Sequence, residues 1–415
     1  MGTKGFFGES MGLRIGDRTT VAIETVAFGG EGLGRVDGKV LFVPFTVDGD
    51  VVEVVVEEVR NRFSRGQAIA MATPSPHRAK PRCPYFGRCG GCSYQHIEYG
   101  HQLRLKKQQV VDAFERIGMV SAPQVDDVIP SPLVYGYRGK ADFHVEWAAG
   151  RPPRIGFMDT RGAGLVDIKR CEIIDDSINE CLEDLSKKLA GGMARPVSEE
   201  RLTLWSGDRR DGEGGTSTGN KLAVVQRIVG DRSFTVPAEG FFQANASLTE
   251  SLVDEVRRIA DLKGGEMVVD AYCGSGLFSL FLAADAGEIT GIEASGDAVR
   301  CARINTAGAG FDNVRFIRGD AGEILNRHIA ASGAAVDLLI LDPPRIGCDT
   351  NALSAVAKIA PHKLVYVSCN PATQARDVRY LLERGFALRE LTPIDMFPQT
   401  AHIEVIGTLL GSGRS

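Results

Sequence analysis

The stretch KLVYVSCNPAT, residues 363–373, places a thiol at a position where chemistry is expected. Its hydrophobic run is typical of a buried strand that ends on Cys369, and Asn370 and Pro371 occupy the turn that follows. Open α/β sheets bind their ligands outside the carboxyl ends of their strands. Cys369 is therefore a candidate nucleophile, although a free cysteine more often packs as a small buried hydrophobe.

The stretch MVVDAYCGSG, residues 267–276, predicts a strand followed by a glycine turn that contains Tyr272 and Gly274. Glu293 lies 19 residues after Gly274, at the end of the next predicted strand, where an acid suits ribose hydroxyls. NAD is the standard alternative ligand for such a turn. The turn has one glycine pair instead of G-x-G-x-x-G, so it offers no cradle for a pyrophosphate, and a cofactor without phosphate fits better.

Two further acids end predicted strands: Asp320 follows VRFIRG, and Asp342 follows VDLLIL. Each carboxylate could instead cap a helix, but acids at several successive strand ends argue against coincidence. Carboxylates repel pyrophosphate and attract the sulfonium and ammonium groups of S-adenosylmethionine. The sequence therefore predicts an S-adenosylmethionine site at this edge of a sheet.

The elements that must position these groups alternate between strand and helix from residue 241 onward, which indicates a doubly wound parallel sheet. The first helix of this region has capping-box spacing between Ser247 and Glu250. Residues 12–72 instead predict short strands with frequent turns, typical of a small OB-type barrel.

We therefore expect a multidomain chain. It comprises an OB-like β-barrel over residues 1–73, a mixed α/β central domain over 74–235, and a Rossmann-like α/β methyltransferase domain over 236–415. A helix is predicted over 97–118, with one apolar and one basic side, and it could pack on the catalytic domain.

Composition limits the class of protein. The chain has 415 residues, 43% hydrophobic residues and nine cysteines, with no apolar stretch long enough to span a membrane and no apolar leader. We expect a cytoplasmic monomer without a membrane partner. Its net charge is −5, yet residues 60–107 contain ten basic side chains and one acid. This basic segment indicates either an ordinary solvated surface or attraction to nucleic-acid phosphates.

A cysteine loop lies within the basic segment, in PRCPYFGRCGGCSYQH. Cys83, Cys89 and Cys92 are separated by five and two residues, which brings three thiolates onto one tight loop. Such thiolates favour zinc or an iron–sulfur cluster. Cys171 is the next cysteine along the chain, whereas Cys181 lies on a predicted amphipathic helix and suits packing better. One triplet with one distant thiol is less typical of zinc than of a closed cluster.

These motifs together resemble the RNA (uracil-5-)methyltransferase family. The resemblance covers nearly the whole chain: the barrel resembles an RNA-binding TRAM domain, and the later motifs are FFQAN, DAYCGSG, LDPPR, SCNP and FPQTAHIE. It is strongest to the branch that modifies 23S ribosomal RNA, because the transfer-RNA branch typically lacks both the barrel and the cluster.

The resemblance implies a role for each motif. Cys369 would add to carbon 6 of uracil, and Glu404 would remove the proton from carbon 5, with His402 and Arg345 nearby. The implied contacts to S-adenosylmethionine are Gln243, Tyr272, Glu293, Asp320 and Asp342. A [4Fe–4S] cluster is implied on Cys83, Cys89, Cys92 and Cys171, as a structural element near the RNA. Family members often have Asn where this sequence has Leu277, which removes one polar contact.

Three alternatives stay open at this point. The same chemistry could act on transfer RNA instead of 23S ribosomal RNA. LDPPR also resembles the D-P-P-Y element of adenine amino-methyltransferases, which need no cysteine. A noncatalytic RNA-binding iron–sulfur protein would keep the fold without needing Cys369 and Glu404.

Overall fold

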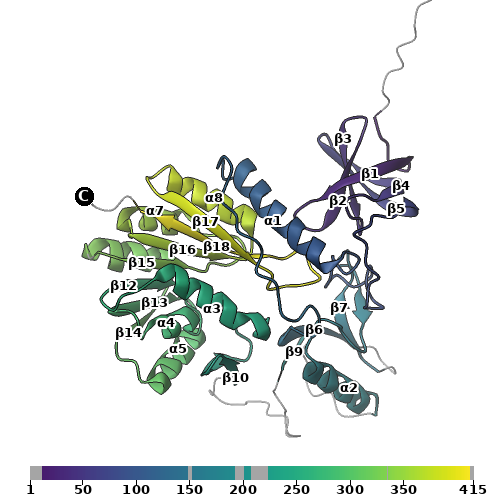
Figure 1. Cartoon of the computed structure of the whole chain (residues 1–415). Helices are drawn as coiled ribbons and strands as arrows, with labels where there is room; N and C mark the ends of the chain where they lie inside the picture. The colour runs from purple at the N-terminus through teal and green to yellow at the C-terminus, as the bar shows by residue number, and fades with distance from the viewer. Residues whose placement is uncertain (1–11, 148–151, 192–200, 207–222, 334, 412–415) are drawn as a thin grey trace, which may run out of the picture. The chain divides into compact units, whose positions relative to one another are not determined.

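The computed structural model describes residues 12–147, 152–191, 201–206, 223–333 and 335–411 (Figure 1). The chain divides into two compact units, and each is described by itself. The first unit comprises Met1–Leu105 together with Gln399–Ala401, and the second comprises Lys106–Pro398 and His402–Ser415. Among the described residues, no helix combines the length and apolarity that crossing a membrane requires.

The first unit contains a closed five-stranded barrel, as the alternating pattern of residues 12–72 predicts. Its strands follow the order β1-β2-β3-β5-β4, and β4 pairs with β1 to close the barrel. The strands are β1 (Arg18–Val26), β2 (Glu31–Val36), β3 (Lys39–Pro44), β4 (Val51–Val59) and β5 (Phe63–Thr73). Alternate valine, isoleucine and leucine side chains point inward and form the barrel core, Val21, Ile23, Leu41, Val43, Val52 and Val54.

A second apolar cluster of this unit joins barrel residues to distant parts of the chain. Val26 and Val47 pack with Tyr94, Ile97, Leu105 and Ala401. The backbone N–H groups of Ser93 and Tyr94 both donate to the carbonyl oxygen of Gln399, at 3.2 and 2.9 Å. The first unit is thus completed by three residues from near the carboxyl end of the sequence.

Several side chains of the basic segment, residues 60–107, form ion pairs with acids that lie elsewhere in the sequence. Arg65 pairs with Glu31 and Glu58, which lie outside residues 60–107, and the exposed Arg60 also pairs with Glu58. Arg78 pairs with the buried Asp50 at 2.7 Å. Much of the positive charge that the sequence places here is therefore balanced by acids from neighbouring strands and loops.

The second unit begins within helix α1 (Tyr99–Arg116), and its described residues form three sheets. A four-stranded sheet has the order β8-β7-β6-β9, and a separate hairpin pairs β10 with β11. These elements are β6 (Lys140–Glu146), β7 (Arg154–Met158), β8 (Leu165–Asp167), α2 (Asp176–Ala190), β9 (Arg201–Trp205), β10 (Val224–Val229) and β11 (Arg232–Pro237).

The largest sheet has seven strands in the order β14-β13-β12-β15-β16-β18-β17. They are β12 (Met267–Ala271), β13 (Glu288–Glu293), β14 (Val314–Arg318), β15 (Leu338–Leu341), β16 (Lys363–Ser368), β17 (Ala387–Ile394) and β18 (Glu404–Leu410). Strands β12 to β16 pair in parallel, as predicted, whereas β18 runs antiparallel to both of its neighbours. The reversal of β18 brings its first residue to the edge where the parallel strands end.

Helices cover both faces of this sheet (Figure 1). They are α3 (Ala246–Ala260), α4 (Leu277–Leu282), α5 (Gly296–Ala309), α6 (Ala321–Ile324), α7 (Thr350–Ile359) and α8 (Pro371–Leu382), with short turns at Leu325–Ile329 and Ala330–Ser332. Alternate residues of one strand enter opposite cores: Val268 packs with α3 and α4, and Val269 packs with α7 and α8. Because both faces are buried, the central strands read as continuous hydrophobic runs.

Helix α3 starts differently from the capping-box prediction. Its N-cap is Asn245, not Ser247, and the Ser247 hydroxyl donates to Asn245 at 2.7 Å. The Asn245 amide instead donates to Ser131 and to the carbonyl oxygen of Met396. The N-cap residue thus uses its side chain for contacts with distant residues and does not cap the helix with it.

Candidate active site

Cys369 follows the last residue of β16, at the carboxyl edge of the seven-stranded sheet, and its side chain is partly exposed. Ser368 pairs with Val405 of β18 in antiparallel register. Continuing that register by one residue sets Cys369 opposite Glu404, and opposite residues of an antiparallel pair lie about 5 Å apart at Cβ. The strand pairing thus brings the two predicted catalytic residues to the same level of the sheet.

The turn after Cys369 is held to the LDPPR loop. The Asn370 side chain accepts from the backbone N–H groups of Ala372 and Thr373, which starts helix α8, and its amide donates to the carbonyl oxygen of Arg345. The Thr373 hydroxyl donates to the same carbonyl at 3.1 Å. The two hydrogen bonds to its carbonyl oxygen hold Arg345 beside the thiol, where its positive charge favours the Cys369 thiolate.

Glu404 is 4% exposed and opens strand β18. His402, two residues earlier, lies with both ring nitrogens 3.3 Å from the Arg345 guanidinium. Burial and the neighbouring cations Arg345, Lys106 and Arg138 lower the pKa of His402 to about 4. His402 is therefore neutral at neutral pH and can position a substrate without adding charge.

Burial and nearby charges shift the pKa values of Cys369, Asp342 and Glu404 at this edge of the sheet. Burial, the Glu404 carboxylate and the Asp342 carboxylate raise the pKa of Cys369 to about 11, while Arg345 opposes that rise. Burial raises the pKa of both Asp342 and Glu404. Asp270 and Glu293 raise the pKa of Asp342 further, and Asp342 raises that of Glu404. At neutral pH the resting thiol is protonated, and the carboxyl pair holds a proton more tightly than isolated carboxylates do.

Arg345→Gln is expected to slow the alkylation of Cys369 several-fold at mildly alkaline pH. Arg345 favours the thiolate, so its loss raises the pKa of Cys369 further, and each pKa unit changes the thiolate fraction about tenfold below the pKa. The measurement is the rate of iodoacetamide labelling of the Cys369 peptide against pH. Arg379→Gln, which removes a surface pair with Glu383, serves as the control and should leave the profile unchanged. An unaltered profile in Arg345→Gln would contradict this assignment.

The loop between β17 and β18 is held by donors from elsewhere in the second unit. Lys106, fully buried, donates to Asp395 at 2.5 Å and to the carbonyl oxygen of Phe397 at 3.1 Å. The Tyr137 hydroxyl donates to the carbonyl oxygen of Pro398 at 3.0 Å. Lys106 belongs to the basic segment of the sequence, but it faces this loop and is not part of a solvent-exposed positive surface.

Lys106→Met is expected to destabilise the protein by about 3–5 kcal/mol, because it leaves the Asp395 carboxylate buried without its cation. Denaturant unfolding would measure the change. The double variant Lys106→Met, Asp395→Asn should recover part of the loss, since it removes the buried charge as well. A single variant within about 1 kcal/mol of the original protein would show that the pair is not needed.

The predicted cofactor residues surround the glycine turn after β12. Tyr272 has a positive φ of 66°, which a side chain rarely adopts, and Gly274 follows at 55°. The backbone N–H of Gly274 donates to the Glu293 carboxylate at 3.1 Å. The sharp turn thus presents Tyr272 and Glu293 at the sheet edge. Asp270 lies fully buried behind the turn, where burial raises its pKa to about 6, and it accepts two hydrogen bonds from Ser279.

Asp320 follows β14 as predicted, but its carboxylate also caps helix α6, accepting from the backbone N–H of Glu323 at 2.9 Å. The helix-cap alternative therefore holds for this acid. Leu277, the position where the family often has Asn, is buried at the start of α4 and offers no polar group.

Two of the predicted cofactor residues keep polar groups available for a ligand. Gln243 is 6% exposed, and within the residues that the structure describes its amide makes no hydrogen bond. The same holds for the carboxylate of Asp342 in the described part of the chain. Gln243 is buried and Asp342 is partly buried, and a ligand that hydrogen-bonds both would give them polar partners. The donor set fits the polar and cationic groups of S-adenosylmethionine.

The cysteine loop lies in the first unit. Cys83, Cys89 and Cys92 are partly exposed, and the backbone N–H of Gly91 donates to the Cys89 sulfur at 3.4 Å. Burial raises the pKa of Cys89, and the nearby Cys83 raises it further. Three thiols on one loop, with a backbone donor at one sulfur, are the type of ligand that an iron–sulfur cluster uses. Cys171 lies in the second unit and is buried, with its backbone held by the Asn179 side chain.

Comparison with known proteins shows which family the chain belongs to. The crystal structure of Pyrococcus abyssi tRNA (uracil-54, C5)-methyltransferase in complex with S-adenosyl-L-homocysteine shares the fold, with a TM-score of 0.70, 24% identity and coverage of 94% of this chain and 100% of that chain. An uncharacterized RNA methyltransferase of Halalkalibacterium halodurans is 33% identical, over 95% of this chain and 97% of the relative. The tRNA (uracil(54)-C(5))-methyltransferase of Schizosaccharomyces pombe is 34% identical, over 94% of this chain and 77% of the relative. The tRNA (Uracil-5-)-methyltransferase family matches residues 219–412.

The chain belongs to the RNA (uracil-5-)methyltransferase family. The TRAM family matches residues 13–69, which confirms the interpretation of the barrel. As a member of the RNA (uracil-5-)methyltransferase family, the protein uses S-adenosylmethionine and acts on RNA.

Sequence reasoning missed several residues that shape the site of this RNA (uracil-5-)methyltransferase. Thr373 and Tyr137 hold the two loops that carry Arg345 and His402, yet neither belongs to a motif with an assigned role. Asn370 is predicted only as a turn residue, whereas an Asn before Pro at the start of a helix is an N-cap signal that indicates its position.

Proposed function

We propose that the protein methylates carbon 5 of a uridine through a transient bond between the Cys369 sulfur and carbon 6 of the ring. The observation that carries this proposal is the meeting of Cys369, Arg345, Asp342 and Glu404 at one edge of the sheet. Carbon 5 of uracil is a poor nucleophile, and addition of a thiolate at carbon 6 makes it electron-rich. Arg345 favours the thiolate that this addition needs.

Gln243, Tyr272, Glu293, Asp320 and Asp342 would hold S-adenosylmethionine. When bound, this cofactor supplies the methyl group to carbon 5. Glu293 suits the ribose hydroxyls, and the free polar groups of Gln243 and Asp342 suit the remaining polar parts of the cofactor.

Glu404 would then take the proton that carbon 5 still carries, and the electron pair left behind expels the Cys369 sulfur. Because burial and Asp342 raise the pKa of Glu404, its carboxylate is a stronger proton acceptor than an exposed one. His402 and Arg345 would orient the ring between the thiol and the base.

Each part of the chain would then have its own role in this reaction. Residues 1–73 would bind RNA, residues 74–235 would carry the cysteine loop, and residues 236–415 would carry catalysis. Cys83, Cys89, Cys92 and Cys171 would hold a [4Fe–4S] cluster, which would stabilise the RNA-facing region and supply no electron to methylation.

We propose 23S ribosomal RNA as the substrate, because the barrel and the cysteine set are features of that branch of the family. Transfer RNA is the second candidate. The relatives from S. pombe and P. abyssi are named for uridine 54 of transfer RNA, and both align with 94% of this chain. The barrel alone therefore does not separate the two substrates.

Methylation of purified 23S ribosomal RNA and of transfer RNA, each lacking 5-methyluridine, would test this function. With labelled S-adenosylmethionine, the expected product after nucleoside digestion is labelled 5-methyluridine from 23S ribosomal RNA. Label confined to transfer RNA would overturn the choice of substrate. Methyladenosine would overturn the uracil chemistry, and no label on either RNA would favour a noncatalytic binding protein.

A further inference from the structure

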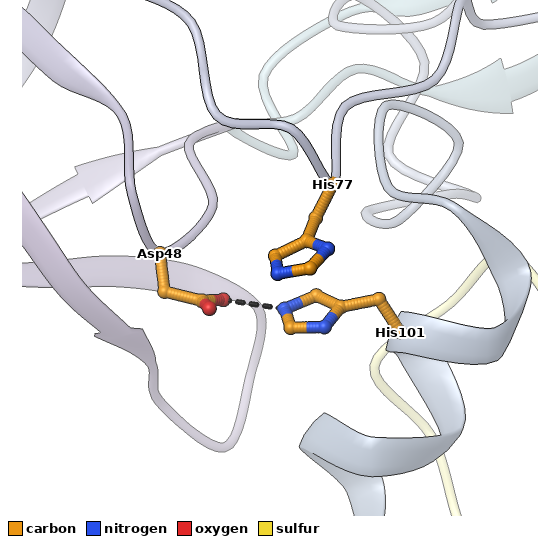
Figure 2. Close-up of side chains that lie close together, drawn as sticks. All are labelled: Asp48, His77 and His101. Atoms are coloured by element: carbon orange, nitrogen blue, oxygen red, sulfur yellow. Dashed lines mark hydrogen bonds and ion pairs between the residues drawn. The ribbon is translucent and has the colours of Figure 1, made fainter.

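Two histidines and one aspartate of the first unit converge at a point that the methylation reaction does not use (Figure 2). Asp48 lies between β3 and β4, His77 follows β5, and His101 lies in the first turn of α1. Each offers one ligand atom, and these three atoms lie within 4.8 Å of one another. Three separate segments of the chain thus direct metal-ligating side chains to one place.

The contacts among these side chains leave a ring nitrogen of His77 available as a ligand. His101 Nε2 lies 2.6 Å from the Asp48 carboxylate, and its ring stacks on that of His77 with centroids 3.8 Å apart. Figure 2 shows one ring nitrogen of His77 on the same side as the His101 nitrogen that contacts Asp48. Within the described residues, the His77 ring makes no hydrogen bond, so this nitrogen can act as a ligand.

We propose that Asp48, His77 and His101 form a binding site for a divalent transition-metal ion, with zinc as the best match. Two imidazoles and one carboxylate suit zinc and its neighbours, whereas magnesium and calcium prefer oxygen ligands. Bonds of about 2 Å place the ligands of one zinc ion about 3–3.5 Å apart. The three atoms would therefore close in by about an ångström, and water would fill the fourth position.

Metal binding at this site requires a change of tautomer in His101. The exposed Arg104 guanidinium lies 3.0 Å from His101 Nδ1 and donates to it, so Nε2 carries the proton that faces Asp48. A metal ion on Nε2 displaces this proton, and a neutral ring then carries its proton on Nδ1. Arg104 can no longer donate there and must turn away. The arginine is thus a competitor of the metal, not a ligand.

The ion would join the barrel, the segment after the barrel and the start of α1 within the first unit. Because each ligand comes from a different segment, binding should stabilise the first unit against unfolding by mass action. This role is separate from that of the cysteine loop, which offers sulfur ligands, and separate from the methylation chemistry.

Cobalt(II) titration of the full chain after chelation with EDTA would test the site. Cobalt on nitrogen and oxygen ligands absorbs weakly in the visible range, whereas cobalt on the cysteine loop would add intense sulfur-to-metal bands. The original protein is expected to bind about one equivalent with the nitrogen and oxygen signature. Asp48→Asn and His77→Asn should each weaken that binding by at least about tenfold, and Arg104→Gln should bind at least as tightly as the original.

His77→Asn removes a ring without breaking a hydrogen bond, so it tests the site even if Asp48→Asn unfolds, which circular dichroism would reveal. Absence of the nitrogen and oxygen signature in the original protein would overturn the proposal. Equal binding by His77→Asn would overturn it as well, because the metal would then lie elsewhere.

Discussion

Replacing Cys369 by alanine is expected to reduce RNA methylation by more than about 10³-fold and to abolish any covalent bond between protein and RNA. The reason is chemical: without the sulfur, nothing adds to carbon 6, and carbon 5 stays a poor nucleophile. The side chain is partly exposed and small, so its loss should change the free energy of unfolding little. Transfer of label from S-adenosylmethionine to RNA, together with denaturing gel electrophoresis, would measure both effects.

Cys181→Ala is the matched control, because Cys181 is also partly exposed but lies on helix α2, which contains none of the predicted catalytic or cofactor residues. It should methylate RNA at the original rate. A Cys369→Ala variant that still forms a denaturant-stable adduct with RNA would show that another residue is the nucleophile.

Glu404→Gln is expected to slow methylation by about 10²–10⁴-fold while allowing the Cys369–RNA adduct to accumulate. Glutamine cannot accept the proton from carbon 5, so the reaction stops after the methyl group has been transferred and before the sulfur leaves. The variant should fold as well as the original protein, because it removes a buried charge that repels Asp342. A gel-shifted species containing both labelled RNA and protein would be the signature.

Glu383→Gln, a surface carboxylate at the end of helix α8, serves as the control for charge removal and should turn over normally. If Glu404→Gln lost activity without any adduct, Glu404 would act before carbon 6 is attacked. If it retained full activity, another base would remove the proton.

The barrel and the parallel strands could be predicted from the sequence, because each depends on the pattern of residues that are neighbours in the chain. Alternating valines predicted the barrel, and buried hydrophobic runs with glycine turns predicted the parallel strands that end at Tyr272 and Cys369. The order of motifs then indicated one sheet edge, since parallel strands share their carboxyl ends.

Features that depend on distant partners could not be predicted in this way. Lys106 has the sequence surroundings of a surface cation, and only Asp395, far along the chain, explains its complete burial. Ser247 has the spacing of a cap, yet Asn245 takes that position because its amide also reaches Ser131 and Met396. The Asp48, His77 and His101 group has no sequence spacing at all that would reveal it.

The three-residue contribution of Gln399–Ala401 to the first unit has a consequence for protein synthesis. All five strands of the barrel lie before residue 74, so the barrel can form while the ribosome is still translating the middle of the message. The neighbouring cluster of Val26, Val47 and Tyr94 must wait for Ala401. The amino-terminal unit is therefore among the first to begin folding and among the last to finish, and a nascent chain released early would expose that unfinished apolar patch to chaperones.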